Sequence, residues 1–429
     1  MKTSESKKFI ANTGWLVFDK IFHMLLSLVV TSMTARYLGT EGYGIINYGL
    51  SFINIFTIIC KLGIDSIIVN ELVKNKGQRD ELLGTTLGLR LMSSLCSLLL
   101  TYIAVIVLKP GEYAVLFITM IQSVSLLFVA FDTVDFYFQS ILKSKYTAWA
   151  RSISYPLVCL FRLILVFAKA DIKYFAWATV LDAATIGAVL LYFYVKKEGG
   201  KFKFSWTTAG KLLKYSKPFI LANLLVTIYT QMDRLMIGSI STDAEVGIYS
   251  AAMTIANLWI FIPNAIIDSA RPLIMEQKSL GKNEAYILRY KQLYAGISWI
   301  SLAAGVFFTV CSKIVIWIIY GEQYLTSVPV LMILIWSRWF SLLGVARNIW
   351  MVCENKSRYV KWFIGAGAIL NVILNYYLIP IWGAAGAAAA TLVTELLSSF
   401  LLVGVVKETR PLFRLMIEAF LLRGIKKDS

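Results

Sequence analysis

Residues 86–108 read TLGLRLMSSLCSLLLTYIAVIVL, an apolar run in which Arg90 is the one charged side chain. A stretch of about 20 mostly apolar residues is long enough to cross the hydrocarbon core of a bilayer as a helix. Within lipid, every backbone amide needs a partner inside the segment, which favours a helix. The period-2 alternation that is typical of membrane barrels is absent. This run therefore predicts a transmembrane helix.

The same kind of run recurs along the whole chain of 429 residues, of which 58% are hydrophobic and 16% charged. Because soluble domains carry about 25% charged residues, this composition excludes an ordinary globular protein. We expect an all-α polytopic membrane protein with about twelve transmembrane helices. The expected spans are 13–37, 44–70, 86–108, 113–140, 150–168, 174–195, 216–238, 246–270, 288–311, 326–350, 358–379 and 383–405.

Neither the N-terminus nor the cysteines indicate processing or a metal site. The first apolar run lacks a small-residue cleavage site after a short core, so it predicts a retained first helix rather than a removed signal peptide. The cysteines lie in or beside apolar runs, without the spacing of metal ligands or disulfides. We therefore expect no metal, no cofactor and no catalytic residue. The five cysteines are Cys60, Cys96, Cys159, Cys311 and Cys353.

The distribution of basic residues predicts the orientation of the spans. If both termini are cytoplasmic, 30 of the 42 lysines and arginines lie on the cytoplasmic side. The outer side then holds Lys109, Lys169, Lys173 and Lys313. Cytoplasmic loops are enriched in basic residues, and one missed span would reverse every later loop. The asymmetry therefore supports both the orientation and the expected number of helices.

Two pairs of matching segments indicate an internal duplication. Residues 143–149 (KSKYTAW) resemble residues 356–362 (KSRYVKW), and residues 36–45 (RYLGTEGYGI) resemble residues 234–248, in which the loop is longer. Each pair occupies corresponding places in two sets of six helices, which should therefore run the same way through the membrane.

We expect four regions along the chain. The tail carries apolar and basic residues between Pro411 and Ile425, which favours a helix on the inner membrane surface over a frayed end. The regions are an N-terminal lobe (1–195), a cytoplasmic basic linker (196–215), a C-terminal lobe (216–405) and a cytoplasmic amphipathic tail (406–429).

Several strings resemble the Wzx-type polysaccharide flippases, and together they cover nearly the whole chain. They are residues 15–20 (WLVFDK), 35–39 (ARYLG), 42–48, 63–66 (GIDS), 71–73 (ELV), 84–90 and 370–388. The resemblance implies membership of the multidrug/oligosaccharidyl-lipid/polysaccharide exporter superfamily. It implies two parallel six-helix lobes in a V shape around a central cavity. Lipid II flippases typically carry two further helices, which argues against that identity.

The resemblance also implies a function. Such a protein moves oligosaccharide repeat units on undecaprenyl diphosphate from the inner to the outer leaflet of the bacterial cytoplasmic membrane. It would work by alternating access in the synthesis of a surface polysaccharide such as O-antigen. Expected partners are the lipid-linked glycan, membrane lipids and a polysaccharide polymerase, and no nucleic acid.

Ionisable residues within spans are costly, so each should face a partner or a wet cavity. Basic side chains suit the phosphate oxygens of such a substrate, and a low dielectric strengthens the attraction. Pairing with a carboxylate is the structural alternative for each; Lys61 and Asp65, four residues apart, suit such an ion pair. The expected cationic cavity residues are Lys20, Arg36, Lys61, Arg90 and Arg234.

A second set of polar residues is expected to couple transport to a proton or sodium ion, or to line the cavity. His23 is the one histidine of the chain and titrates near neutral pH when unperturbed. A structural hydrogen bond between helices is the alternative for His23. The expected residues are Asp19, His23, Asp65, Asp233, Asn264 and Asp268.

Two alternative functions follow from the same sequence. A drug/cation antiporter of the same superfamily is disfavoured by the cationic residues within the spans. A membrane-embedded glycan polymerase or ligase would commonly need a substantial outer loop with acidic or basic residues, and the expected outer loops are short. We therefore do not expect an enzyme.

The cationic-cavity hypothesis predicts the effect of two substitutions. We expect Lys20→Ala and Arg234→Ala each to reduce transport of the lipid-linked glycan, because each removes positive charge from the passage. A transport assay measures this, and full activity in a variant would remove that residue from the site.

Overall fold

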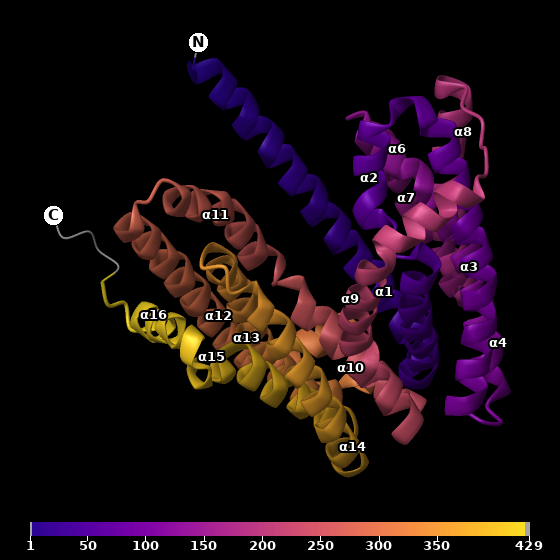
Figure 1. The fold of residues 1–429 in the computed structure, drawn as a ribbon. Helices are drawn as coiled ribbons and strands as arrows, with labels where there is room; N and C mark the ends of the chain where they lie inside the picture. Colours follow the sequence, from indigo (N-terminus) through magenta and orange to yellow (C-terminus); the bar gives the residue numbers. More distant parts are fainter. Residues whose placement is uncertain (1, 425–429) are drawn as a thin grey trace.

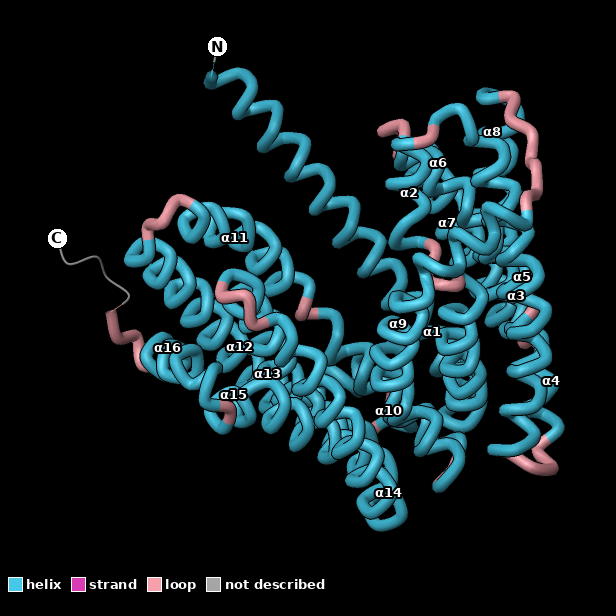
Figure 2. Tube along the Cα trace, in the orientation of Figure 1, coloured by secondary structure: helices cyan, strands magenta, loops and turns pink. Residues whose placement is uncertain are grey.

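The computed structural model of the protein describes the backbone of residues 2–424 and the side chains of residues 24–424 apart from those at 66, 198 and 222. Within this part of the chain all regular structure is helical (Figures 1 and 2). The expected all-α class is therefore confirmed. The side chains of Asp19, Lys20 and His23 lie outside the described residues.

The helices fall into two halves around an irregular segment at 199–205. The first half contains α1 (Lys2–Lys61), α2 (Asp65–Lys74), α3 (Arg79–Leu108), α4 (Tyr113–Ser123), α5 (Ser125–Val129), α6 (Thr133–Ser140), α7 (Lys145–Phe167) and α8 (Ile172–Glu198). The second contains α9 (Trp206–Ile240), α10 (Asp243–Leu258), α11 (Phe261–Ser279), α12 (Asn283–Tyr320), α13 (Ser327–Cys353), α14 (Ser357–Leu396), α15 (Leu402–Val405) and α16 (Arg410–Phe420).

Helix α1 turns back on itself at Gly39, whose backbone has φ 71° and ψ 178°. Thr31 and Leu50, on either side of the turn, line one cavity of 160 Å³. In a straight helix their 19-residue separation would span about 28 Å. Helix α1 is therefore two antiparallel helices joined at a glycine, as the first two expected spans require.

Helix α14 turns back in the same way at Gly383, with φ 54° and ψ −129°. Asn375 and Thr391, which flank the turn, both donate hydrogen bonds to the carboxylate of Asp233. A straight helix would hold them about 24 Å apart. The last two expected spans, 358–379 and 383–405, are thus the two arms of this hairpin.

Eight helices of the described chain are long and apolar enough to cross a membrane, and a ninth arises if α10 and α11, bent by 44°, form one span. Two of the eight, Met24–Lys61 and Ser357–Val405, contain the reversals at Gly39 and Gly383. The protein is a multi-pass membrane protein. All twelve expected ranges are helical over most of their length, but the count of twelve membrane crossings remains a prediction.

The cores divide the molecule into two groups of helices that share one end. One core lies among α2, α3, α6, α7, α8 and the start of α9, and a second lies among α11 to α16. A third core joins the opposite ends of both groups through α1 and α10. Figure 1 shows the groups diverging from this shared end, with the first part of α1 between them. The two groups of helices are therefore arranged in a V.

Helices α1 and α10 cross at the shared end through two glycines. A Cβ atom on Gly44 would lie 1.7 Å from the carbonyl oxygen of Asp243, and one on Gly247 would lie 2.0 Å from that of Thr40. The contact is reciprocal, because each glycine packs against the carbonyl group of the residue four positions before the other glycine. Gly44 and Gly247 are also the matched glycines of the two similar segments, so the contact supports the duplication.

The connection between the halves is shorter and more ordered than the expected linker 196–215. Only 199–205 is irregular, and it lies along the start of α3, where a Cβ on Gly84 would be 2.4 Å from the backbone of Lys203. The amide of Lys203 donates to the carbonyl of Asp80 (2.9 Å). The first turns of α9 therefore pack with the first group of helices.

The tail forms α16, as the amphipathic pattern predicts, but its apolar face is not open to lipid. Leu412 and Met416 are fully buried in the core shared with α12 and α15. Phe420 stacks on Trp299 of α12, with ring centroids 5.8 Å apart. Helix α16 thus belongs to the second group of helices.

The α14 hairpin predicts a contrast between two helical glycines. A Cβ on Gly386 would lie 2.2 Å from the carbonyl oxygen of Leu378 on the opposite arm, whereas nothing lies within 4 Å of one on Gly296. We expect Gly386→Ala to destabilise the protein by about 1–3 kcal/mol through overpacking. Gly296→Ala should stabilise it by about 0.5–1 kcal/mol.

Melting temperatures of the purified variants in one detergent would measure this contrast. Equal melting temperatures for the two variants would contradict the close packing of the hairpin arms.

Candidate functional site

A polar cavity of 510 Å³ lies inside the second group of helices, among α9, α10, α13 and α14. It contains more ionisable side chains than any of the other cavities described below. Its charged and polar lining includes Tyr229, Gln231, Asp233, Arg234, Tyr249, Asn257, Arg338, Arg347, Asn348, Asn371, Thr391 and Glu395.

Two pairs of residues, each spaced four apart on one helix, form one wall of this cavity. Tyr229 and Asp233 lie one turn apart on α9, and Thr391 and Glu395 lie one turn apart on the second arm of α14. The hydroxyl of Thr391 donates to Asp233 (2.7 Å), and that of Tyr229 donates to Glu395 (3.2 Å). Each carboxylate is thus fixed by a hydroxyl from the facing helix.

Asp233 is a buried carboxylate, 7% exposed, whose partners are all neutral. Its Oδ2 accepts from the Tyr249 hydroxyl (2.5 Å) and from Thr391, and its Oδ1 accepts from Asn375 Nδ2 (2.8 Å). No described basic group lies within 4 Å of it. The amide oxygen of Asn375 is buried without a partner. This arrangement is rich in oxygen and lacks a positive charge.

The arginines of the cavity keep donors free. Arg234 donates to Ser250 Oγ and Gln231 Oε1, both at 3.2 Å. Arg347, 3% exposed, donates to the carbonyl of Ser398 (2.6 Å). The Nε groups of Arg338 and Arg347 are buried without hydrogen-bond partners. Three guanidinium groups face two carboxylates, with no ion pair within 4 Å among the described side chains, so the cavity can accept an anion.

Three of the expected cavity residues form an ion-pair network in the first group of helices. Lys61 Nζ lies 3.7 Å from carboxylate oxygens of both Asp65 and Asp132, and fully buried Arg90 donates to Asp65. The Lys61–Asp65 pair is confirmed. Because Lys61, Arg90 and Asp65 already have partners of opposite charge, a substrate or coupling ion would have to compete with them.

Arg36 lies at the shared end of the two groups. Its guanidinium donates to the carbonyls of Ile318 and Ile319 at the C-terminus of α12. A cation is favourable at that end of a helix dipole. Arg36 lines none of the described cavities, and its expected role in substrate binding stays a prediction.

The two expected residues of α11 lie apart from the polar cavity. Asp268 is 70% exposed and pairs with Arg271 at 3.4 Å. Asn264 is half-buried in the first turn of α11. Of the expected site residues whose side chains are described, Lys61, Arg90 and Asp65 come together in the ion-pair network, and Asp233 and Arg234 line the polar cavity.

Arg338, Arg347, Tyr229 and Glu395 line the cavity, although the expected site does not contain them. The sequence gives some signal for them, because an ionisable residue in a span needs a partner or a cavity. Tyr229 and Asp233 are four residues apart, as are Thr391 and Glu395, and this spacing is also visible in the sequence. The contacts between the α9 pair and the α14 pair depend on the reversal of α14 at Gly383, which the spacing of the residues does not predict.

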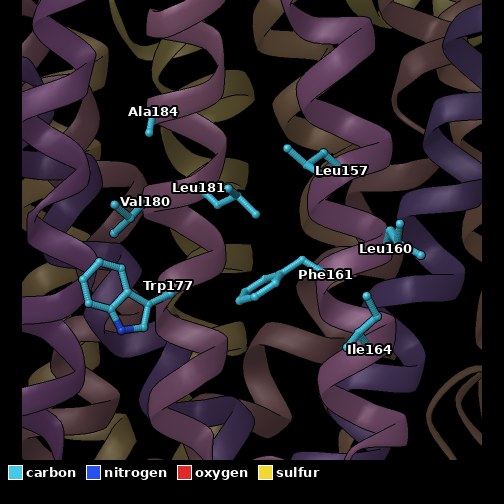
Figure 3. A pocket seen from close by; sticks show the side chains of 8 residues that line it. All are labelled: Leu157, Leu160, Phe161, Ile164, Trp177, Val180, Leu181 and Ala184. Carbon is cyan, nitrogen blue, oxygen red and sulfur yellow. The ribbon is translucent and has the colours of Figure 1, made fainter.

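Two other cavities have different linings. A cavity of 290 Å³ in the first group is mainly acidic, with Asp132, Asp135 and Asp182 on its wall. A groove of 480 Å³ between α7 and α8 is lined by aliphatic and aromatic side chains, and Phe161 reaches from α7 toward α8 (Figure 3). An exposed apolar surface of this kind suits contact with lipid, so we do not assign it to a polar substrate.

The chain matches a family of known proteins over most of its length. Residues 9–277 match the family described as "Polysaccharide biosynthesis protein". The chain is 23% identical over 412 residues to the putative O-antigen transporter of Escherichia coli strain K12, covering 93% of this chain and 97% of that protein.

Solved structures share the fold at low sequence identity. The lipid II flippase MurJ, in an inward closed conformation, has a TM-score of 0.71 at 15% identity and covers 95% of this chain and 90% of its own. A multidrug resistance MATE family transporter of the MOP superfamily, in an inward-facing conformation, has a TM-score of 0.70 at 13% identity, with 92% and 96% covered. The chain belongs to the polysaccharide biosynthesis protein family and has the fold of MOP superfamily transporters.

Proposed function

We propose that the protein is a flippase for an anionic, lipid-linked oligosaccharide, with an undecaprenyl-diphosphate-linked repeat unit as its substrate. The observation that carries this proposal is the cavity with three arginines that lack carboxylate partners. The family and the putative O-antigen transporter that it matches support the same assignment.

The cavity chemistry fits a diphosphate better than a neutral sugar or a cation. Guanidinium groups present planar pairs of donors to phosphate oxygens, and charge-assisted hydrogen bonds are stronger than neutral ones. Arg234, Arg338 and Arg347 supply these donors, two of them with an unpaired Nε. At 510 Å³ the cavity suits a phosphate-bearing headgroup, while the sugars would extend beyond it. The same arginines disfavour a cationic drug.

The V-shaped packing supports transport by alternating access. The two groups share a core at the end that carries Gly39, Lys109 and Gly383, and have separate cores at the end that carries the lysine-rich segment 199–205. We place the lysine-rich end, with both termini, in the cytoplasm. The structure would then be open inward, as the inward-facing MATE family structure is named.

We further propose that Asp233 is the site of the coupling cation. Its carboxylate, the side-chain amides of Asn371 and Asn375 and the hydroxyl of Thr391 come together from α9 and both arms of α14. Oxygen ligands of this kind suit a small hard cation. A proton would instead bind the Asp233 carboxylate directly. Either species would neutralise a buried negative charge that has only neutral partners.

If the polar cavity binds the phosphate headgroup, Arg338→Gln should reduce the rate of flipping. Removing this guanidinium should lower the rate of flipping in proteoliposomes by about 10- to 100-fold, as expected for a lost charge-assisted hydrogen bond. Arg358→Gln is the matched control, because Arg358 is exposed, lies outside the polar cavity and donates to the Tyr359 hydroxyl at 2.8 Å. A wild-type rate in a folded Arg338→Gln protein would contradict the assignment.

The coupling assignment predicts a change in ion dependence. Asp233→Asn removes the charge but keeps the size, so flipping should no longer respond to a sodium or proton gradient. Initial rates with and without each gradient measure this response, and Asp171→Asn serves as the control because Asp171 is exposed and lies outside the polar cavity. If Asp233→Asn retained the wild-type gradient dependence, the coupling site would lie elsewhere.

A further inference from the structure

One ion pair joins the two groups of helices at their shared end. Lys109 Nζ lies 3.0 Å from Asp243 Oδ1, and 3.0 and 3.1 Å from the two carboxylate oxygens of Glu112. Lys109 is 7% exposed and Asp243 is 11% exposed. One ammonium group, largely shielded from water, is therefore shared between two carboxylates.

The two carboxylates belong to different parts of the molecule. Lys109 directly follows α3 and Glu112 directly precedes α4, so both move with the first group of helices. Asp243 begins α10 beside the shared core. Among the described side chains, Lys109–Asp243 is the one ion pair that would break if α10 separated from α3.

Asp243 also takes part in the crossing of α1 and α10. Its carbonyl oxygen is the atom against which Gly44 packs, while its carboxylate holds Lys109. Tyr48, one turn after Gly44, donates to or accepts from Ser239 at 3.0 Å, and the Lys109 ammonium lies 5.5 Å from its ring. The backbone crossing and the ion pair are therefore parts of one contact, and separation of the helices would break both.

We propose that Lys109 and Asp243 form a latch that holds this end closed, and that Glu112 keeps Lys109 when the latch opens. The proposal rests on the alternating access of the proposed function and specifies how it is regulated. In the closed state Lys109 bridges Asp243 and Glu112. In the open state Lys109 remains paired with Glu112, and Asp243 lies at the N-terminus of α10, where the helix dipole favours a negative charge.

This transfer between partners explains the need for two carboxylates. A buried charge left without a partner is costly, whereas a charge that retains one is not. Glu112 is 44% exposed, so it remains hydrated while it holds Lys109. The latch can thus open without leaving an unpaired ammonium group in a dry site.

Opposite effects of the two carboxylates test the latch. Asp243→Asn weakens only the closed state and should raise the open-to-closed ratio by about tenfold, as for one lost charged hydrogen bond. Glu112→Gln removes the sole carboxylate partner of Lys109 in the open state but only one of two in the closed state. It should therefore lower the ratio.

The measurement uses spin labels at two exposed positions of this end, Tyr113→Cys at the start of α4 and Ile381→Cys just before the turn in α14, in the full chain without its native cysteines. Distance distributions in lipid nanodiscs give the two populations. Lys173→Gln is the control, since Lys173 is exposed and faces only Asp171.

Opposite shifts for Asp243→Asn and Glu112→Gln support the latch. Unchanged populations in Asp243→Asn, or shifts of the same sign in both variants, would overturn it. Glu112 is exposed, so its substitution keeps the test valid if Asp243→Asn fails to fold. The populations are measured without substrate, so loss of the latch and loss of the proposed transport activity remain distinguishable.

Discussion

The backbone crossing of Gly44 and Gly247 is the contact on which the rest of the architecture depends. Each glycine lies against the carbonyl of the other helix so closely that no Cβ fits. This approach brings α1 and α10 together at one end, and with them Lys109 and Asp243. The two groups of helices therefore meet where their backbones touch and separate where their cores are distinct. The crossing and the Lys109–Asp243 ion pair are parts of the same contact.

Charged residues within the membrane form ion pairs in the first group of helices but not in the polar cavity of the second. In the first group, Arg90 and Lys61 pair with Asp65 and Asp132. These ion pairs offset much of the desolvation free energy of the buried charges. In the second, Arg338 and Arg347 lack ion pairs within 4 Å among the described residues, whereas buried donors without partners occur in both groups, on Arg90 as well as on Arg338 and Arg347. Unsatisfied donors in a cavity are costly unless a ligand or water uses them. This difference locates the proposed headgroup site in the second group.

Hydropathy and the positions of basic residues were enough to predict the helical class and the helical ranges, because lipid tolerates few other structures. The spacing of Lys61 and Asp65 was enough to suggest their ion pair. The repeated segments around Gly44 and Gly247 were visible, but their direct contact was not, because a duplication does not say which faces meet. The same holds for Arg36, whose partners at the end of α12 come from a distant part of the chain. The positions of charged residues within the spans did not show which cations would pair with carboxylates and which would lack such partners.

The most direct test of the central claim is translocation of a defined glycan by the purified protein. Liposomes would contain fluorescent undecaprenyl-diphosphate-linked oligosaccharide in one leaflet, and an impermeant quencher would report its arrival in the other. The account predicts protein-dependent transfer of the intact lipid-linked glycan, with its mass unchanged. No transfer by folded protein, or a glycan lengthened or cleaved from its lipid, would contradict a flippase.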